Sequence, residues 1–178
     1  IYTDIEEIMQ KNLDIGIDLS IITNGQELNG KNAEVLKNAK WVRISAGEID
    51  AKNFAETRKR PESWFFKLKD NIQNFAKTKS FECEFGINFV VHHFNKDEVY
   101  EAAKFFKELG LNHIKFTPRW IDEKDKWKEY HEPFKENVIE QIKRAKEELV
   151  DSNFAIFDTY ENDFKLTGVP HRGYTMCP

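Results

Sequence analysis

Cysteine is scarce in this sequence. Of its 178 residues only Cys83 and Cys177 are cysteines, and neither has a second cysteine or a histidine at metal-ligand spacing. This scarcity excludes a disulfide framework and a complete zinc site, because both need several such residues in a defined pattern. We expect both thiols to be reduced.

Long apolar runs and an excess of basic residues are also missing. No stretch approaches the roughly 20 apolar residues that a membrane-spanning helix needs, and the first residues have no signal-peptide character. The formal net charge is -4, which is not the basic balance of a nucleic-acid-binding protein. The short basic run 58–60 is typical of a solvated loop, although it could also hold an anionic substrate. We therefore expect a cytoplasmic protein without a membrane or nucleic-acid partner.

The sequence does contain enough apolar residues for one core. With 40% hydrophobic and 33% charged residues, the simplest expectation is a single globular domain over residues 1–178. The chain opens on Ile1 rather than on methionine, and it closes on a Gly/Pro-rich stretch that ends at Cys177-Pro178. We expect a fragment of a longer protein, with residues 166–178 beginning a further extension.

Apolar segments of strand length alternate with segments of helical periodicity, and the strand-like segments end in polar or turn residues. The sequence predicts strands at Ile17–Thr23, Trp41–Ser45, Glu84–Val91, His113–Thr117 and Phe154–Asp158. It predicts helices over Thr3–Asn12, Asn32–Ala39 and Ser63–Lys77, then one through Val99–Phe106, and a longest helix through Val138–Leu149. This alternation predicts an α/β fold, a partial (β/α) barrel of TIM type with parallel strands and a site at the strand ends.

Polar residues at the expected helix ends predict how the helices start and stop. Ser63 is placed to cap the third helix, and Asn95 with Glu98 is placed to cap the fourth. Gly110 is typical of the left-handed residue that ends a helix. The charged segment before Ser63 is expected to be a loop, and residues 122–133 a charged insertion.

Four short segments resemble, in their order, those of one enzyme superfamily. They are Thr23-Asn24-Gly25, Val42–Ser45, Ile87–Val91 followed by Asn95 and Glu98, and Ile114–Phe116. Together they resemble radical S-adenosylmethionine (radical SAM) enzymes of the molybdenum-cofactor-synthesis and peptide-modifying type. The resemblance implies an enzyme that starts radical chemistry with S-adenosylmethionine and a [4Fe-4S] cluster. It also implies a small-molecule or peptide substrate.

The chain departs from that superfamily in the part that holds the cluster. Radical SAM enzymes bind the cluster through the thiolates of a Cys-x3-Cys-x2-Cys loop. The sequence contains neither this loop nor the GGEP-like segment that would precede Ile1. The resemblance therefore implies the portion of the barrel that follows the cluster loop, and by itself this portion is expected to bind neither cofactor.

The matching motifs imply which residues would contact S-adenosylmethionine. The Ser45 hydroxyl would contact its ribose or carboxylate and the Asn88 amide its ribose, while Thr23 and Asn24 would face cofactor or substrate. Each has an ordinary structural alternative. Thr23-Asn24-Gly25 would then be only a turn, and Ser45 and Asn88 would be satisfied interior polar groups.

The resemblance also implies roles near the end of the fourth strand and of the chain. Pro118 and Trp120 would lie against the adenine, with the alternative that Trp120 anchors a loop. Cys177 would be a ligand of an auxiliary iron-sulfur cluster. The segment from Trp120 to Phe134 is where we expect substrate specificity, because strand-end loops carry it. Alanine replacement of Trp127 or Tyr130 is then expected to change substrate affinity more than stability.

Two other functions remain open. A lysine inside an apolar strand is desolvated, so the pKa of Lys115 would fall and its amine could form a Schiff base, as in class I aldolases. A cluster-free binding or scaffold domain is the other alternative.

Several further polar residues are weaker candidates for a functional role. Acid–base candidates at strand ends are Glu48, Asp158 and Glu161; the adjacent His92 and His93 would point to opposite faces of a strand, and Cys83 would be a packing residue.

Overall fold

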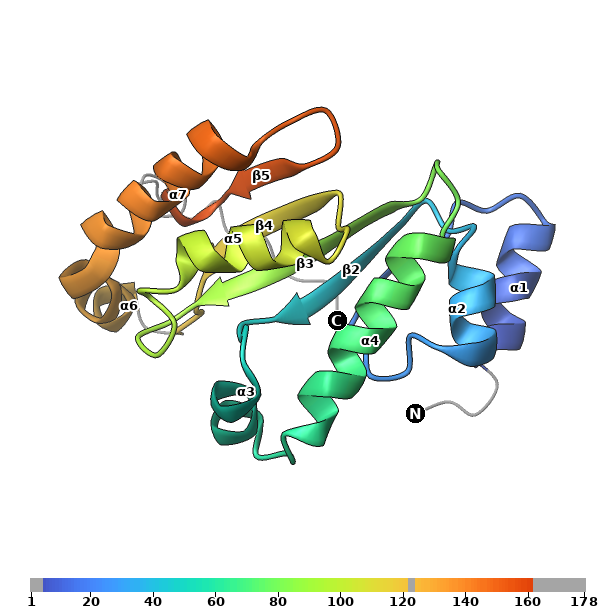
Figure 1. The fold of residues 1–178 in the computed structure, drawn as a ribbon, viewed down its shortest axis with the longest axis horizontal. Helices are drawn as coiled ribbons and strands as arrows, with labels where there is room; N and C mark the ends of the chain where they lie inside the picture. The colour runs from blue at the N-terminus through green and yellow to red at the C-terminus, as the bar shows by residue number, and fades with distance from the viewer. Residues whose placement is uncertain (1–4, 122–123, 162–178) are drawn as a thin grey trace.

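The computed structural model describes residues 5–121 and 124–161 (Figure 1). Five strands form one sheet in the order β1-β2-β3-β4-β5, and all neighbouring pairs are parallel. The strands are β1 (Ser20–Thr23), β2 (Trp41–Ala46), β3 (Glu84–Val91), β4 (His113–Pro118) and β5 (Ala155–Asp158). Parallel neighbours joined by helical connections confirm the predicted α/β, partial (β/α) barrel architecture.

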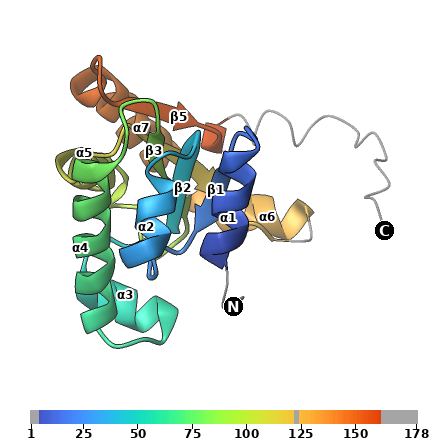
Figure 2. The same ribbon diagram turned by 90° about the vertical axis from the view of Figure 1, so that its right-hand side faces the viewer.

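Helices connect the strands and pack on the sheet. They are α1 (Ile5–Asp14), α2 (Gly30–Leu36), α3 (Ala51–Arg58), α4 (Ser63–Thr78), α5 (Val99–Glu108), α6 (Lys124–His131) and α7 (Lys135–Leu149), with a 3-10 turn η1 (Glu132–Phe134) after α6. In Figure 2, α4 and α5 lie on one side of β1 and β2. None of the helices in the described part of the chain is long and apolar enough to cross a bilayer.

The two faces of the sheet differ in burial. Side chains that alternate along the central strands are fully buried against the helices; they include Val42, Ile44, Phe85, Ile87, Phe89, Ile114 and Phe116. The residues between them point the other way. We call this second side the open face, and it carries Ile22, Arg43, Ser45, Asn88, His113, Lys115 and Phe157. Two of its apolar side chains, Ile22 and Phe157, are 59% and 51% exposed.

The C-terminal end of α5 is as predicted. Gly110 has a φ of +89°. Its N–H donates to the carbonyl of Lys107, and the N–H of Leu111 donates to the carbonyl of Phe106. This pair of bonds is the Schellman arrangement, in which a left-handed glycine lets the chain satisfy carbonyls that the helix leaves unpaired.

The predicted N-terminal caps are wrong. No side-chain cap bond begins α4, which starts at Ser63, or α5, whose cap position is Glu98. The side-chain oxygen of Gln141 on α7 instead accepts from the first two N–H groups of α5, at 3.0 and 3.2 Å. A side chain from another helix therefore satisfies the N–H groups that a local cap was expected to satisfy. The Asn95 side chain instead bonds the ends of β2 and β3, as described below.

The structure also corrects several predicted bounds. The first strand begins at Ser20 rather than Ile17, and the second helix covers Gly30–Leu36 rather than Asn32–Ala39. Among the described helices α4, with 16 residues, is longer than α7, with 15.

Two segments expected to lack a helix contain one. The charged segment after β2 forms α3, which begins where the Asp50 side chain accepts from the N–H of Asn53 at 2.9 Å. The insertion after β4 contains α6. Each helix follows the carboxyl end of a strand in the chain, and α3 lines the pocket described below.

Candidate functional site

The turn after β1 has a structural reason for its residues. Gly25 has a φ of +76°, and a Cβ there would lie 2.5 Å from the Leu68 side chain, so only glycine fits. Thr23 Oγ1 accepts from the N–H of Gly25 at 3.2 Å, and Asn24 Oδ1 accepts from the N–H two residues on at 3.1 Å. Thr23 pairs with Ile44, which places it on the helix-covered face. These contacts favour the turn interpretation of this motif.

Ser45, Asn88 and Lys115 form one row on the open face. Register pairs Ser45 with Asn88 and Asn88 with Lys115, on β2, β3 and β4. Neighbouring strands are about 4.8 Å apart, so the three side chains are within reach of a single ligand. Thr117 adds a hydroxyl that donates to Asn88 Oδ1 at 3.3 Å. The row thus combines hydroxyl, amide and amine groups, each half-buried.

The chain leaves the sheet at Pro118, the last residue of β4. The N–H of Arg119 donates to the carbonyl of Val91 at 2.9 Å, which fixes this exit against the end of β3. Trp120 follows and is 73% exposed. An exposed indole beyond a strand end offers a surface on which a planar ring can stack.

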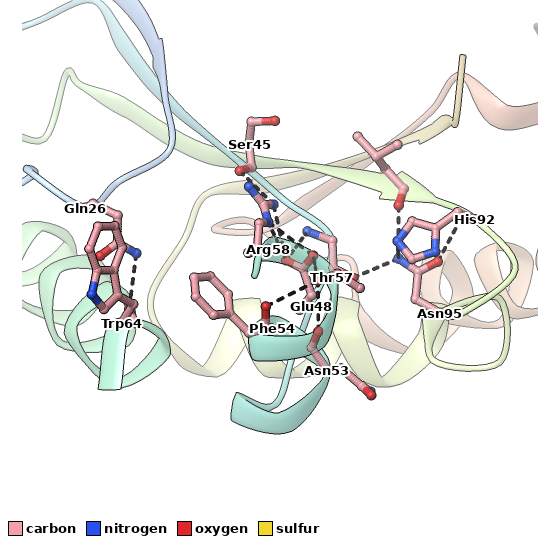
Figure 3. Close-up of polar contacts among 12 residues, drawn as sticks. Gln26, Ser45, Glu48, Asn53, Phe54, Thr57, Arg58, Trp64, His92 and Asn95 are labelled. Carbon is pink, nitrogen blue, oxygen red and sulfur yellow. Dashed lines mark hydrogen bonds and ion pairs between the residues drawn. The ribbon is translucent and has the colours of Figure 1, made fainter. Parts of the chain in front are cut away.

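An open pocket of about 680 Å³ lies at the carboxyl ends of β2 and β3, against α3. Its buried acid is Glu48, whose two carboxylate oxygens each accept from Arg58 Nε at 3.2 Å, while Thr57 Oγ1 donates to one of them at 2.6 Å (Figure 3). Arg58 also donates from Nη2 to the carbonyl of Ser45 at 3.4 Å. The Ser45 hydroxyl points away from this cluster in Figure 3. The backbone of Ser45 therefore joins the pocket to the row on the open face.

Asn95 ties the ends of β2 and β3 together. Its Nδ2 donates to the carbonyls of Gly47 and Val90, at 2.7 and 2.9 Å, and its Oδ1 accepts from the N–H of His92 at 2.8 Å. The residue is 3% exposed. Because every polar atom of this amide is used, Asn95 holds the floor of the pocket in place.

His92 and His93 follow β3 rather than lie in it, so the predicted opposite orientation of strand neighbours does not apply. His92 Nδ1 accepts from the N–H of Phe94 at 3.2 Å, and burial lowers the pKa of His92. The N–H of His93 donates to the Tyr130 hydroxyl on α6 at 3.0 Å. The described residues contain no group of three side chains placed to hold a metal ion.

The insertion after β4 is packed into the structure. Trp127 is 5% exposed and His131 is fully buried. His131 Nε2 donates to the carbonyl of Arg119 at 3.0 Å, and its Nδ1 accepts from the Tyr160 hydroxyl at 3.1 Å. Burial lowers the pKa of His131, which suits a neutral ring with one donor and one acceptor. This burial corrects the expectation that Trp127 acts mainly on substrate affinity.

Three other residues were singled out by the sequence, and the structure describes two of them. Asp158 lies on the helix-covered face and forms an ion pair with Lys146 at 3.1 Å. Cys83 is buried, burial raises the pKa of its thiol, and its predicted packing role is confirmed. Cys177 lies outside the described residues.

His113 is a further polar residue of the open face, in the row next to Lys115 on the amino side. It is 5% exposed, and its ring lies over Gly86, where a Cβ would be 2.1 Å from Nε2. Burial, and to a smaller extent the nearby Arg43 charge, lower the pKa of His113 to about 4. The imidazole is therefore neutral in the folded protein at neutral pH.

This lowered pKa predicts how stability depends on pH. Unfolded histidine has a pKa near 6.5, so between about pH 6.5 and 4 the unfolded state binds more protons. The contribution of His113 should be fully present above pH 6.5 and be lost as pH falls toward 4, by about 3 kcal/mol in total. Urea unfolding of the wild type and of His113→Phe across this range measures it. A pH dependence that is equal in the two proteins would contradict the assignment.

Sequence reasoning missed Arg58, the linking role of Asn95, and His113. The sequence places Arg58 in a basic run typical of a solvated loop, because nothing local shows that its side chain reaches Glu48. A usable signal existed for His113, because a glycine inside a strand, here Gly86, often marks the close approach of another group.

No protein-family model matches this chain, and no curated protein matches it. Solved structures do resemble it. SuiB from Streptococcus suis bound to S-adenosylmethionine has a TM-score of 0.62 at 17% identity, over 88% of this chain and 35% of SuiB. The likeness shows the fold. SuiB bound to its precursor peptide SuiA has a TM-score of 0.57 at 18% identity, over 87% of this chain and 35% of SuiB.

A second protein shares the architecture. A domain of pyruvate-formate lyase-activating enzyme from Bacteroides vulgatus has a TM-score of 0.54 at 13% identity, over 85% of this chain and 88% of that domain. The chain thus spans about a third of the length of SuiB and most of this domain. Both likenesses support the partial (β/α) barrel, and activity has to be argued from the residues of the site.

Proposed function

We propose that this chain is the cofactor- and substrate-binding part of a radical SAM enzyme. The observation that carries the proposal is the register of Ser45 with Asn88 on the open face. The two residues come from separate motifs of the radical SAM resemblance, and the fold places them side by side. The likeness to a SuiB structure that holds S-adenosylmethionine supports the same conclusion.

The residues present fit the adenosine part of S-adenosylmethionine. The Ser45 hydroxyl can donate and accept, and the Asn88 amide offers both kinds of group, as sugar hydroxyls require. Pro118 and the exposed Trp120 suit the adenine ring. Bound beside a reduced cluster, S-adenosylmethionine supplies the radical that starts the reaction.

The residues of this chain do not fit the [4Fe-4S] cluster itself. Cys83 is buried beneath the sheet as a packing residue, and Cys177 is the only other cysteine of the sequence. Three cluster thiolates would have to come from outside these 178 residues. Cys177 remains a proposed ligand of an auxiliary cluster.

The pocket at the strand ends is the proposed place for the substrate. The buried Glu48 and its partner Arg58 shape one wall, and Thr57 adds a hydroxyl. The proposed substrate is a small molecule or a peptide. The likeness to SuiB, which has been solved with a precursor peptide bound, supports a peptide as the substrate.

Loss of the two adenosine contacts should weaken S-adenosylmethionine binding. In a protein that joins this chain to a cluster-binding segment, with the cluster reconstituted anaerobically, Ser45→Ala and Asn88→Ala should each raise the KM for S-adenosylmethionine by roughly 5- to 10-fold, the effect of one lost hydrogen bond. The rate of 5′-deoxyadenosine formation measures this. The control Ser152→Ala, in an exposed loop, should leave KM unchanged. Unchanged KM in both test variants would contradict the proposal.

The second candidate is a Schiff-base enzyme, favoured by the half-buried position of Lys115 in the same row. Borohydride with a keto substrate separates the two, because only a Schiff base is reduced to a stable adduct. Mass spectrometry that finds the adduct on Lys115 would favour the Schiff base, and its absence with active 5′-deoxyadenosine formation would favour radical chemistry.

A further inference from the structure

The open face carries a second polar group nearer the amino ends of the strands. Register places Arg43 beside Gly86, and Gly86 beside His113, on β2, β3 and β4. Because Gly86 has no side chain, Arg43 and His113 face each other across it. The His113 ring lies over Gly86, with Nε2 the nearest atom to a Cβ built there. Both side chains thus flank Gly86 on the open face.

Each of these side chains has a buried nitrogen without a hydrogen-bond partner. Arg43 Nε and His113 Nε2 are inaccessible and unpaired. An unsatisfied buried donor costs about 1 to 3 kcal/mol, and a poorly solvated charge without a partner costs more. Two such atoms on side chains that flank the same glycine indicate that a hydrogen-bonding group belongs between the two side chains.

The charge of Arg43 is also not balanced by a nearby acid. Within the described ranges 5–121 and 124–161, no carboxylate forms an ion pair with Arg43. Glu84, on the same face toward the start of β3, is exposed and makes no such pair. The guanidinium instead lies 5.1 Å from the Trp41 ring centroid. Arg43 therefore has a cation–π contact and no carboxylate partner among the described residues.

We propose that Arg43 and His113 bind the carboxylate of a ligand on the open face. Arg43 Nε–H donates to the carboxylate, and the neutral His113 ring donates from Nε2–H, which satisfies both orphaned nitrogens. Ile22 and Phe157, each more than half exposed, supply apolar surface beside the site. The ligand class is accordingly a carboxylate on an apolar body. The Trp41 ring lies 5.1 Å from the guanidinium, so ligand binding changes the surroundings of the indole.

This proposal does not depend on S-adenosylmethionine. Ser45 and Asn88 lie in the next row toward the carboxyl ends of the strands, and the carboxylate site uses neither. Loss of one site should leave the other unaffected.

Nuclear magnetic resonance of the ¹⁵N-labelled chain tests the proposal, with butanoate as the probe. Titration should give saturable shifts of the Arg43 Nε–H, the His113 Nε2 and the Trp41 indole N–H signals. Arg43→Gln should weaken butanoate binding at least tenfold. Arg144→Gln is the matched control, because Arg144 is exposed on α7 and pairs with Glu148 at 2.9 Å. This variant should bind butanoate with the same affinity as the wild type.

Two further probes decide the ligand class. Butanamide has the same apolar body without the charge, and it should cause no saturable shift of the Arg43 signal. Inorganic phosphate should bind more weakly than butanoate. If butanamide or phosphate binds as well as butanoate, or if butanoate gives no saturable shift at Arg43, the proposal is wrong. Should Arg43→Gln fail to fold, His113→Phe replaces it, and unchanged butanoate affinity there overturns the proposal.

Discussion

Asn95→Ala is expected to lower the free energy of unfolding by about 4 kcal/mol. The change removes three hydrogen bonds at once and leaves the carbonyls of Gly47 and Val90 and the N–H of His92 without partners. A buried polar group that loses its partner costs about 1 to 3 kcal/mol. Urea unfolding followed by circular dichroism measures the loss.

A second variant shows which atoms of Asn95 matter. Asn95→Asp keeps an acceptor for the His92 N–H but sets a carboxylate oxygen against two carbonyl oxygens, so its loss should be at least as large. The control Asn137→Ala removes an exposed amide that donates to Asp97 at 2.8 Å, and it should change stability by less than about 0.5 kcal/mol. Similar losses in the Asn95→Ala and Asn137→Ala variants would contradict the linking role of Asn95.

Trp127→Ala should also destabilise the protein by about 4 kcal/mol, because removal of a buried tryptophan leaves a cavity. Trp127 is 5% exposed, and its ring centroid lies 4.9 Å from that of His131. Its loss loosens α6 against the ends of β4 and β5, where His131 bonds Arg119 and Tyr160. Thermal or urea unfolding measures the effect.

Trp120→Ala is the matched comparison, since Trp120 is 73% exposed. Its replacement should cost less than about 1 kcal/mol of stability while weakening S-adenosylmethionine binding in the cluster-bearing protein. If Trp120→Ala unfolds the protein as readily as Trp127→Ala, the assignment of one tryptophan to the core and the other to the site is wrong.

The parts of the fold that could be predicted from the sequence are those with strong local patterns. The bounds of β3 agree with the expected Glu84–Val91, because a run of β-branched and aromatic residues lies between turn residues. Helix α4 ends within one residue of the expected Lys77, since its apolar positions recur at helical spacing. The left-handed Gly110 follows from the same local rules.

The parts that could not be predicted depend on contacts between distant segments. Helix α3 has a single buried residue, Phe54, so it shows no apolar period. Its position instead follows the bond of Arg58 to Glu48, which local sequence does not reveal. The rows on the open face are of the same kind, because Ser45 meets Asn88 only through strand register. The sequence motifs therefore predicted Ser45 and Asn88 separately, and only the strand register shows that they are neighbours.

The coding sequence upstream of Ile1 is the measurement that tests the central claim most directly. The account predicts an in-frame Cys-x3-Cys-x2-Cys loop followed by a GGEP-like turn, which would supply the three thiolates that this chain lacks. A start codon close to Ile1 with no such loop would contradict radical chemistry. The Schiff-base test of Lys115 and a cluster-free binding function would then take its place.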